Sequence, residues 1–168
     1  VGIDFADAQH RMSNKYKRTV NNACELLEET GFACKGQAVV DFGCGLGTAS
    51  SLIREFIGSE GSYTGIDAIP ANIYGAITMF SSEKFLHGEQ DSPHVKAVLA
   101  QADIVFMRLV TMYQMDGMHE KFLEELIAAM KPGAYLIDIE PAGTDDQRSY
   151  LRQRYGDALN VFWDHKAN

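Results

Sequence analysis

An acid and three glycines at alternate positions lie close together near the start of the chain: Asp41, Gly43, Gly45 and Gly47. A glycine turn between a buried strand and a helix presents backbone N–H groups and a helix N-terminus, which can face a bound ligand. Dinucleotide-binding turns have the spacing G-x-G-x-x-G, but the third glycine of that pattern would fall on Thr48. Because a carboxylate beside the turn repels phosphate and attracts an ammonium group, the pattern favours a positively charged ligand.

Further polar residues follow later apolar stretches. Asp67 ends one of them about twenty residues after the glycine turn, where an acid can meet the hydroxyl groups of a ribose. Cys44, between two of the glycines, is expected to be a small neutral filler whose backbone contributes to binding. Arg108, Tyr113 and His119 come after another apolar run. His119 is the one histidine placed to act as a general base if an acceptor has to lose a proton.

The periodicity alternates between strand and helix types, which is typical of β-α-β units. Such units build a doubly wound α/β fold, a mostly parallel sheet whose ligand crevice lies at the carboxyl ends of the strands. The polar residues above would therefore meet at one edge of the sheet. The expected strands are residues 38–42, 63–66, 84–87, 104–107 and 134–139, and the expected helices are residues 14–30, 48–57, 70–80, 122–130 and 144–159.

Five segments carry a family resemblance when taken in order. Residues 39–50 contain the glycine turn, residues 63–67 end in Asp67, and three more follow at 84–89, 102–109 and 130–136, the last with a Lys-Pro-Gly turn. Together they resemble the motifs of class I S-adenosylmethionine-dependent methyltransferases. The resemblance implies a three-layer αβα fold with strand order 3-2-1-4-5, S-adenosylmethionine as cofactor, and direct SN2 transfer of its methyl group.

The resemblance also implies roles for individual residues. Asp67 would accept hydrogen bonds from the ribose hydroxyls, and Glu89 would lie at the adenine amino group, with Asp91 as a competing choice. The catalytic residues would be Arg108, Tyr113 and His119. The cofactor-binding residues would be Asp41, Gly43, Cys44, Gly45, Gly47, Asp67, Ala68, Glu89, Gln90 and Arg108.

The sheet of that family has seven strands, the last two forming an antiparallel hairpin. After the fifth expected strand only residues 160–163 resemble another one. We therefore expect a truncated domain without the hairpin, whose exposed sheet edge would suit a homodimer. The expected organisation is a single domain over residues 1–168, with a helical lid at 1–34, a cofactor-binding core at 35–140, and a C-terminal helix and tail at 141–168.

Composition narrows the choice of partner and compartment. The 168 residues include 15 Lys and Arg against 23 Asp and Glu, a formal charge of −8, which disfavours nucleic acid as a partner. No apolar run approaches the roughly 20 residues that a membrane-spanning helix needs. The three cysteines lack metal-ligand spacing and suit a reducing compartment, so we expect a cytoplasmic protein without a metal site.

Two alternatives remain at this point. The chain could be a binding module with a methyltransferase-like fold that holds an adenosyl ligand, or pairs through its sheet edge, without catalysis. It could also be a nicotinamide oxidoreductase, although Thr48 argues against that reading. The preferred interpretation is a methyltransferase for a small-molecule acceptor, in which the methyl group goes to oxygen, nitrogen or carbon.

Overall fold

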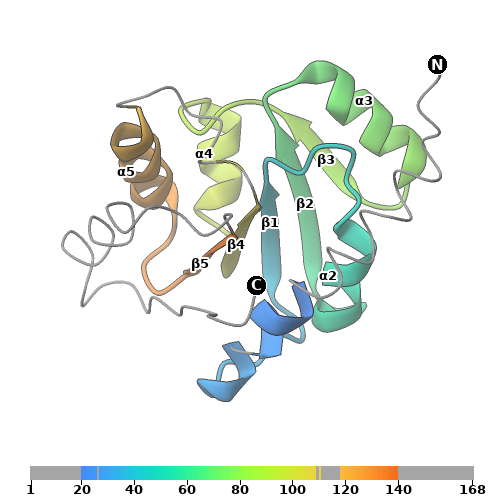
Figure 1. Cartoon of the computed structure of the whole chain (residues 1–168), viewed down its shortest axis with the longest axis vertical. Helices are drawn as coiled ribbons and strands as arrows, with labels where there is room; N and C mark the ends of the chain where they lie inside the picture. The colour runs from blue at the N-terminus through green and yellow to red at the C-terminus, as the bar shows by residue number, and fades with distance from the viewer. Residues whose placement is uncertain (1–19, 26, 109, 111–117, 140–168) are drawn as a thin grey trace.

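A computed structural model describes residues 20–25, 27–108, 110 and 118–139 of the chain (Figure 1). Five strands alternate with helices along this part of the sequence, and residues 20–25 and 27–29 are also helical. The elements are β1 (Ala38–Phe42), α2 (Ser50–Ile57), β2 (Ser62–Asp67), α3 (Pro70–Met79), β3 (Lys84–His87), α4 (Pro93–Leu99), β4 (Ile104–Arg108), α5 (His119–Ala129) and β5 (Tyr135–Ile139).

The strands form one parallel sheet in the order β3-β2-β1-β4-β5, with β1 at its centre. In register, Asp41 of β1 lies beside Gly65 of β2 and beside Phe106 of β4. All five strands point the same way, so their carboxyl ends share one edge of the sheet. The fold class and the strand order predicted from the sequence are confirmed.

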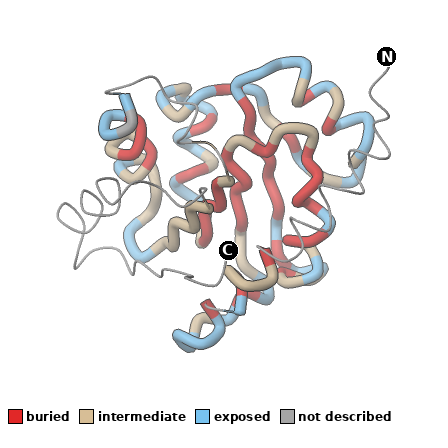
Figure 2. The backbone as a smooth tube through the Cα atoms, in the orientation of Figure 1, coloured by how far each residue is buried: buried red, intermediate tan, exposed pale blue. Residues whose placement is uncertain are grey.

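Both faces of the sheet are covered, which explains why β1 and β4 are almost continuously apolar. Successive residues of β1 point to opposite faces. Val39 packs with residues of α2, of α3 and of the helical segments 20–25 and 27–29, whereas Val40 packs with residues of α4 and α5. Figure 2 shows the buried residues concentrated along the central strands. The result is a three-layer arrangement.

One helix, α4, is absent from the sequence expectations. Pro93 begins it at a position where the missing N–H is tolerated, and Val95 and Leu99, four residues apart, are fully buried. The expected helix at 144–159, the strand at 160–163, and the first residues of the expected helix at 14–30 lie outside the described residues.

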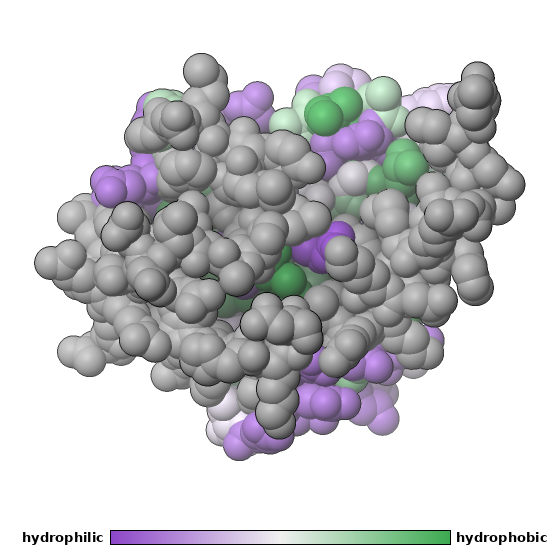
Figure 3. All heavy atoms as spheres, viewed as in Figure 1, coloured by the Kyte–Doolittle hydropathy of each residue, from purple (hydrophilic) through white to green (hydrophobic). Residues whose placement is uncertain are grey.

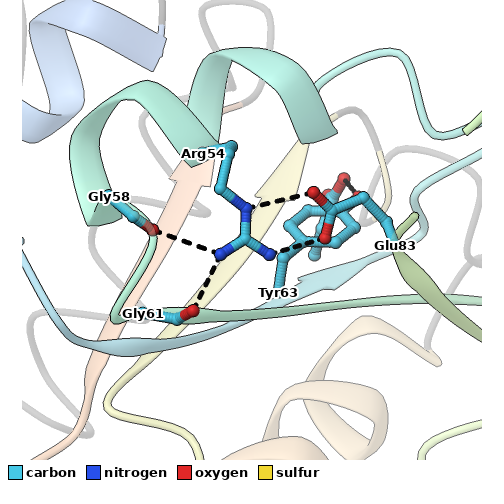
Figure 4. A network of polar contacts seen from close by, with 6 residues as sticks. Arg54, Gly58, Gly61, Tyr63 and Glu83 are labelled. Carbon is cyan, nitrogen blue, oxygen red and sulfur yellow. Dashed lines mark hydrogen bonds and ion pairs between the residues drawn. The ribbon is translucent and has the colours of Figure 1, made fainter.

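Polar contacts hold the amino-terminal ends of the strands together (Figure 4). Arg54 of α2 donates two hydrogen bonds to the Glu83 carboxylate, at 3.0 and 2.6 Å, and further bonds to the carbonyl oxygens of Gly58 and Gly61 at 3.2 and 2.7 Å. This set of four bonds, which we call the Arg54 clasp, fixes the end of α2 to the starts of β2 and β3.

Asp103 joins the other half of the sheet in a similar way. Its carboxylate accepts the Ala38 N–H at 2.7 Å and pairs with the Lys131 ammonium group. Burial raises the pKa of Asp103, but these two bonds outweigh it and hold the pKa below its usual value. The starts of β1 and β4 and the turn before β5 are thereby connected.

The outer surface is mixed in character. Hydrophobic side chains are exposed on and beside α3, among them Tyr74 and Ile77, and Figure 3 shows hydrophobic atoms in the upper part of the view, where α3 lies. None of the helices in the part of the chain that the structure describes combines the length and apolar character that a bilayer-spanning helix requires.

Candidate functional site

The glycine turn after β1 depends on three left-handed residues. Gly43, Gly45 and Gly47 have φ angles of 76°, 55° and 74°, a region that favours glycine. A Cβ on Gly43 would lie 2.4 Å from Val110, and one on Gly47 would lie 2.7 Å from the Phe85 ring. No described atom lies within 4 Å of the corresponding position on Gly45. Gly43 and Gly47 therefore permit close packing, whereas the described residues leave the backbone of Gly45 open to approach.

The N–H groups of the turn bind within the protein. Gly43 and Cys44 both donate to the Ile66 carbonyl oxygen, at 2.8 and 2.9 Å, and Gly45 donates to Oδ2 of Asp67 at 2.9 Å. The turn is therefore tied to the carboxyl end of β2. Cys44 is 5% exposed, and burial raises the pKa of its thiol, which keeps the thiol neutral.

Asp67, at the end of β2, is held in one orientation by three donors. Besides the Gly45 N–H, it accepts the Ile69 N–H at 2.8 Å and the Asn72 side-chain amide at 3.2 Å, both on Oδ1. A carboxylate offers about four acceptor positions, so roughly one remains for a ligand hydroxyl. The position of Asp67 was predictable from the end of a strand, but its link to Asn72 was not.

Asp41 lies beneath the turn and has a partner that the sequence analysis did not identify. Its Oδ2 accepts a hydrogen bond from the Tyr63 hydroxyl at 2.7 Å, and both residues are 3% exposed. Burial raises the pKa of Asp41 to about 7; the Tyr63 bond lowers it and the charge of Asp67 raises it further. The available signal was the two-residue spacing of Tyr63 and Gly65, which places both on the same face of β2 as Asp41 on β1.

Two carboxylates therefore lie next to the glycine turn, and their partners among the described residues include no Lys, Arg or His. Proximity without a countercharge raises the energy of the ionised pair. A cation bound at the turn would relieve that repulsion, whereas a phosphate would add to it. These two carboxylate acceptors therefore suit a positively charged ligand.

The remaining predicted residues are distributed around the same edge. Ala68 and Glu89 are exposed, directly after β2 and in the loop after β3, and Gly88 N–H donates to the Asp67 carbonyl oxygen at 3.1 Å. The Gln90 side chain instead donates to Glu125 of α5 at 2.8 Å, so its amide is directed towards that helix.

Arg108, Tyr113 and His119 were predicted as catalytic residues. Arg108 ends β4 and is half-buried. His119 is the first residue of α5, but its side chain, like the whole of Tyr113, lies outside what the structure describes. Over the same described part of the chain, no group of three or more His, Cys, Asp or Glu is placed to hold a metal ion.

Solved structures with a similar fold come from several organisms. A SAM-dependent methyltransferase from Aquifex aeolicus has a TM-score of 0.59 at 19% identity, over 83% of this chain and 87% of that one. Magnesium protoporphyrin IX methyltransferase from Synechocystis, solved with bound SAM, has a TM-score of 0.55 at 16% identity, over 77% of this chain and 61% of that one. A putative RNA methyltransferase from Pyrococcus horikoshii has a TM-score of 0.59 at 15% identity, over 82% of this chain and 65% of that one.

These low identities establish the fold alone, and the two proteins whose names give an acceptor differ in it: magnesium protoporphyrin IX in one and RNA in the other. No curated protein matches the chain. The family of methyltransferase domains matches residues 8–165, nearly the whole sequence. The family and enzyme class expected from the sequence are thereby confirmed: the chain belongs to the methyltransferase domain family.

Proposed function

We propose that this methyltransferase domain transfers the methyl group of S-adenosylmethionine, its cofactor, to a small-molecule acceptor by direct displacement. The observation that carries the proposal is the pair of buried carboxylates, Asp41 and Asp67, against an open glycine turn. Their negative charge suits the ammonium and sulfonium groups of the cofactor, and the remaining acceptor position of Asp67 suits a ribose hydroxyl.

The proposed binding residues follow the edge of the sheet. Gly45 allows the cofactor to approach the backbone, while Gly43, Cys44 and Gly47 shape the turn beneath it. Asp41 supplies charge from below. The other residues proposed to line the cofactor are Asp67, Ala68, Glu89, Gln90 and Arg108. Gln90 would have to exchange its bond with Glu125 for one to the ligand.

When bound, the cofactor supplies a methyl carbon attached to an excellent leaving group. The protein therefore mainly has to orient the acceptor, which can remove about 7–11 kcal/mol of the barrier. We propose this role for Arg108 and Tyr113, which follow the apolar run of β4. His119 is proposed as the base that removes a proton from the acceptor, because histidine titrates near neutral pH.

A small-molecule acceptor is proposed on grounds of charge. Nucleic-acid binding is dominated by cationic contacts to phosphates, and this chain carries a formal charge of −8. The described cysteines Cys24, Cys34 and Cys44 are all free thiols, which supports the proposal of a reducing, cytoplasmic setting.

Calorimetric titration with S-adenosylmethionine tests the cofactor site. Asp67→Asn should weaken binding by about 1.5–3 kcal/mol, because it removes a charged acceptor from the ribose. Glu60→Gln makes the same change in charge at an exposed residue that lies just before β2, at the amino-terminal ends of the strands. This variant should bind S-adenosylmethionine with the wild-type affinity.

Equal affinity in the Asp67→Asn variant and the wild type would remove Asp67 from the cofactor site. Preferential binding of NADH would instead favour an oxidoreductase. An acceptor panel completes the test: tight binding of S-adenosylmethionine with no methyl consumption would favour the non-catalytic binding module.

A further inference from the structure

We propose that Tyr63 is a positioning residue for the cofactor site, whose hydroxyl holds the Asp41 carboxylate ready for a cation and thereby sets the pH range in which cofactor binding releases a proton. The proposal rests on the proposed function, because the cation is that of the bound cofactor. Nothing in the family assignment gives Tyr63 a role, and the residue lies below the turn rather than in contact with the open side.

The geometry leaves Tyr63 little freedom. In register, Tyr63 lies beside Val39, and Gly65 lies beside Asp41, so the phenol extends along the face of the sheet towards the end of β1. Gly65 contributes no side chain, and a Cβ there would lie 2.6 Å from the Phe85 ring. That ring packs edge-on against Tyr63, with centroids 5.9 Å apart. The Tyr63 hydroxyl is thereby directed at Asp41.

The bond matters because Asp41 has no other donor among the described residues. A buried carboxylate without hydrogen bonds is strongly destabilised in its charged form. The Tyr63 hydroxyl stabilises that form at 2.7 Å. Burial and the charge of Asp41 raise the pKa of Tyr63 well above its ordinary value, so the phenol stays protonated and keeps donating.

The charged and titratable groups that the structure describes around Asp41 oppose its ionisation or are already paired. Asp67 contributes a negative charge from β2, and the buried Cys44 thiol lies in the turn. Glu83 stands beyond Tyr63 but is bound by Arg54, the cation that α2 supplies. From β4, the residue in register is the apolar Phe106. Within the described part of the chain, the Tyr63 bond alone favours the charged form.

Burial and the Asp67 charge oppose ionisation of Asp41 and the Tyr63 bond favours it, so cation binding beside Asp41 depends on pH. With a pKa of about 7, Asp41 is partly protonated near neutral pH. A cation bound at the turn favours the ionised carboxylate, so binding releases a proton and weakens as the pH falls below about 7, by at most about tenfold per pH unit. Loss of the Tyr63 hydroxyl would raise the pKa of Asp41 and move the whole profile to higher pH.

The first experiment compares Tyr63→Phe with the wild type by calorimetric titration of S-adenosylmethionine between pH 6 and 9. A hydrogen bond to a charged group corresponds to a shift of about one to two pH units in the midpoint. Tyr74→Phe is the matched control, since Tyr74 is 78% exposed on α3, and should follow the wild-type profile. Coinciding profiles for Tyr63→Phe and the wild type would overturn the proposal.

Carboxyl NMR of Asp41 in the protein without ligand gives a readout that is independent of turnover. The titration midpoint should be higher in Tyr63→Phe than in the wild type, and an unchanged midpoint would again overturn the proposal. If S-adenosylmethionine binds the wild type at no pH, the proposed function fails. The NMR midpoint still reports on the Tyr63–Asp41 bond.

A wild-type measurement covers the case in which Tyr63→Phe does not fold. Titrations in two buffers with different ionisation enthalpies give the number of protons released per cofactor bound. Release of a substantial fraction of a proton at pH 6.5 and almost none at pH 8.5 is expected. Equal release at both values would contradict the proposal.

Discussion

Gly45 and Gly47 share a left-handed backbone but differ in their surroundings. Gly47 has the Phe85 ring and Ala76 beside it, whereas no described atom approaches the Cβ position of Gly45. The sequence spacing identified both glycines, since a turn after a buried strand needs them. It could not distinguish packing from openness, because that difference depends on Phe85, which comes from β3 much later in the chain.

Alanine substitutions should separate the two roles. Gly47→Ala adds a steric clash to left-handed strain and should lower the free energy of unfolding by about 2–4 kcal/mol. Gly45→Ala should lower it by only about 1–2 kcal/mol, the strain alone, but weaken cofactor binding. Urea denaturation and calorimetry provide the two measurements.

Gly133→Ala serves as the control, since Gly133 has a φ of 82° with open surroundings, far from the turn in sequence. Its loss of stability should match that of Gly45→Ala, with unchanged cofactor affinity. A Gly47→Ala variant as stable as these two would mean that the close approach to Phe85 relaxes without penalty.

At the level of elements, the sequence predicted the strands better than it predicted the side-chain contacts that join them. The short strand β3 was located at its observed bounds, because an apolar residue pair follows a loop at the right place in the β-α-β alternation. Helix α4 has only seven residues, too few to repeat an apolar pattern clearly, and was missed. Contacts such as the Arg54 clasp join residues 29 positions apart, a pairing that local periodicity does not reveal.

The Arg54 clasp should contribute measurably to stability. Arg54→Met removes the fork that binds Glu83, whose side chain is only 12% exposed, and should lower the free energy of unfolding by about 2–3 kcal/mol. Arg54→Lys keeps the positive charge but lacks the planar guanidinium group, so its free energy of unfolding should lie between those of Arg54→Met and the wild type. Chemical denaturation monitored by circular dichroism measures both.

The exposed pair of Lys121 and Glu125 on α5, 3.7 Å apart, offers a control. Lys121→Met removes a positive charge in the same way but should change stability by less than about 0.5 kcal/mol. If Arg54→Met and Lys121→Met lower the free energy of unfolding equally, the Arg54 clasp contributes no more than an ordinary surface ion pair.

For the whole molecule, the buried acid beneath the turn links stability to pH. The pKa of Asp41 is about 7 in the folded protein, above the value of about 3.9 for an unfolded chain. Between these values the native state holds more protons than the unfolded state. The contribution of Asp41 to the free energy of unfolding therefore falls as pH rises from about 4 to 7, and is constant above that range.

Asp41→Asn should remove this dependence, because the amide oxygen can still accept the Tyr63 bond without carrying charge. The difference in free energy of unfolding between Asp41→Asn and the wild type should grow in favour of the variant from pH 5 to pH 8. It should grow by about 1.4 kcal/mol for each pH unit up to about 7, the pKa of Asp41, and stay constant above it. Urea unfolding of both proteins at the two pH values measures the gain. A constant difference between variant and wild type would show that Asp41 has an ordinary pKa.

The parallel direction of the strands places the Arg54 clasp and the Asp103 contacts at one rim of the sheet and the glycine turn, Asp41 and Asp67 at the other. Residues that secure the scaffold are thus a full strand's length from residues that meet a ligand. Side chains at the ligand rim can consequently be exchanged without breaking the anchoring bonds at the opposite rim. The same separation makes the ligand rim the natural place to randomise in a directed-evolution library.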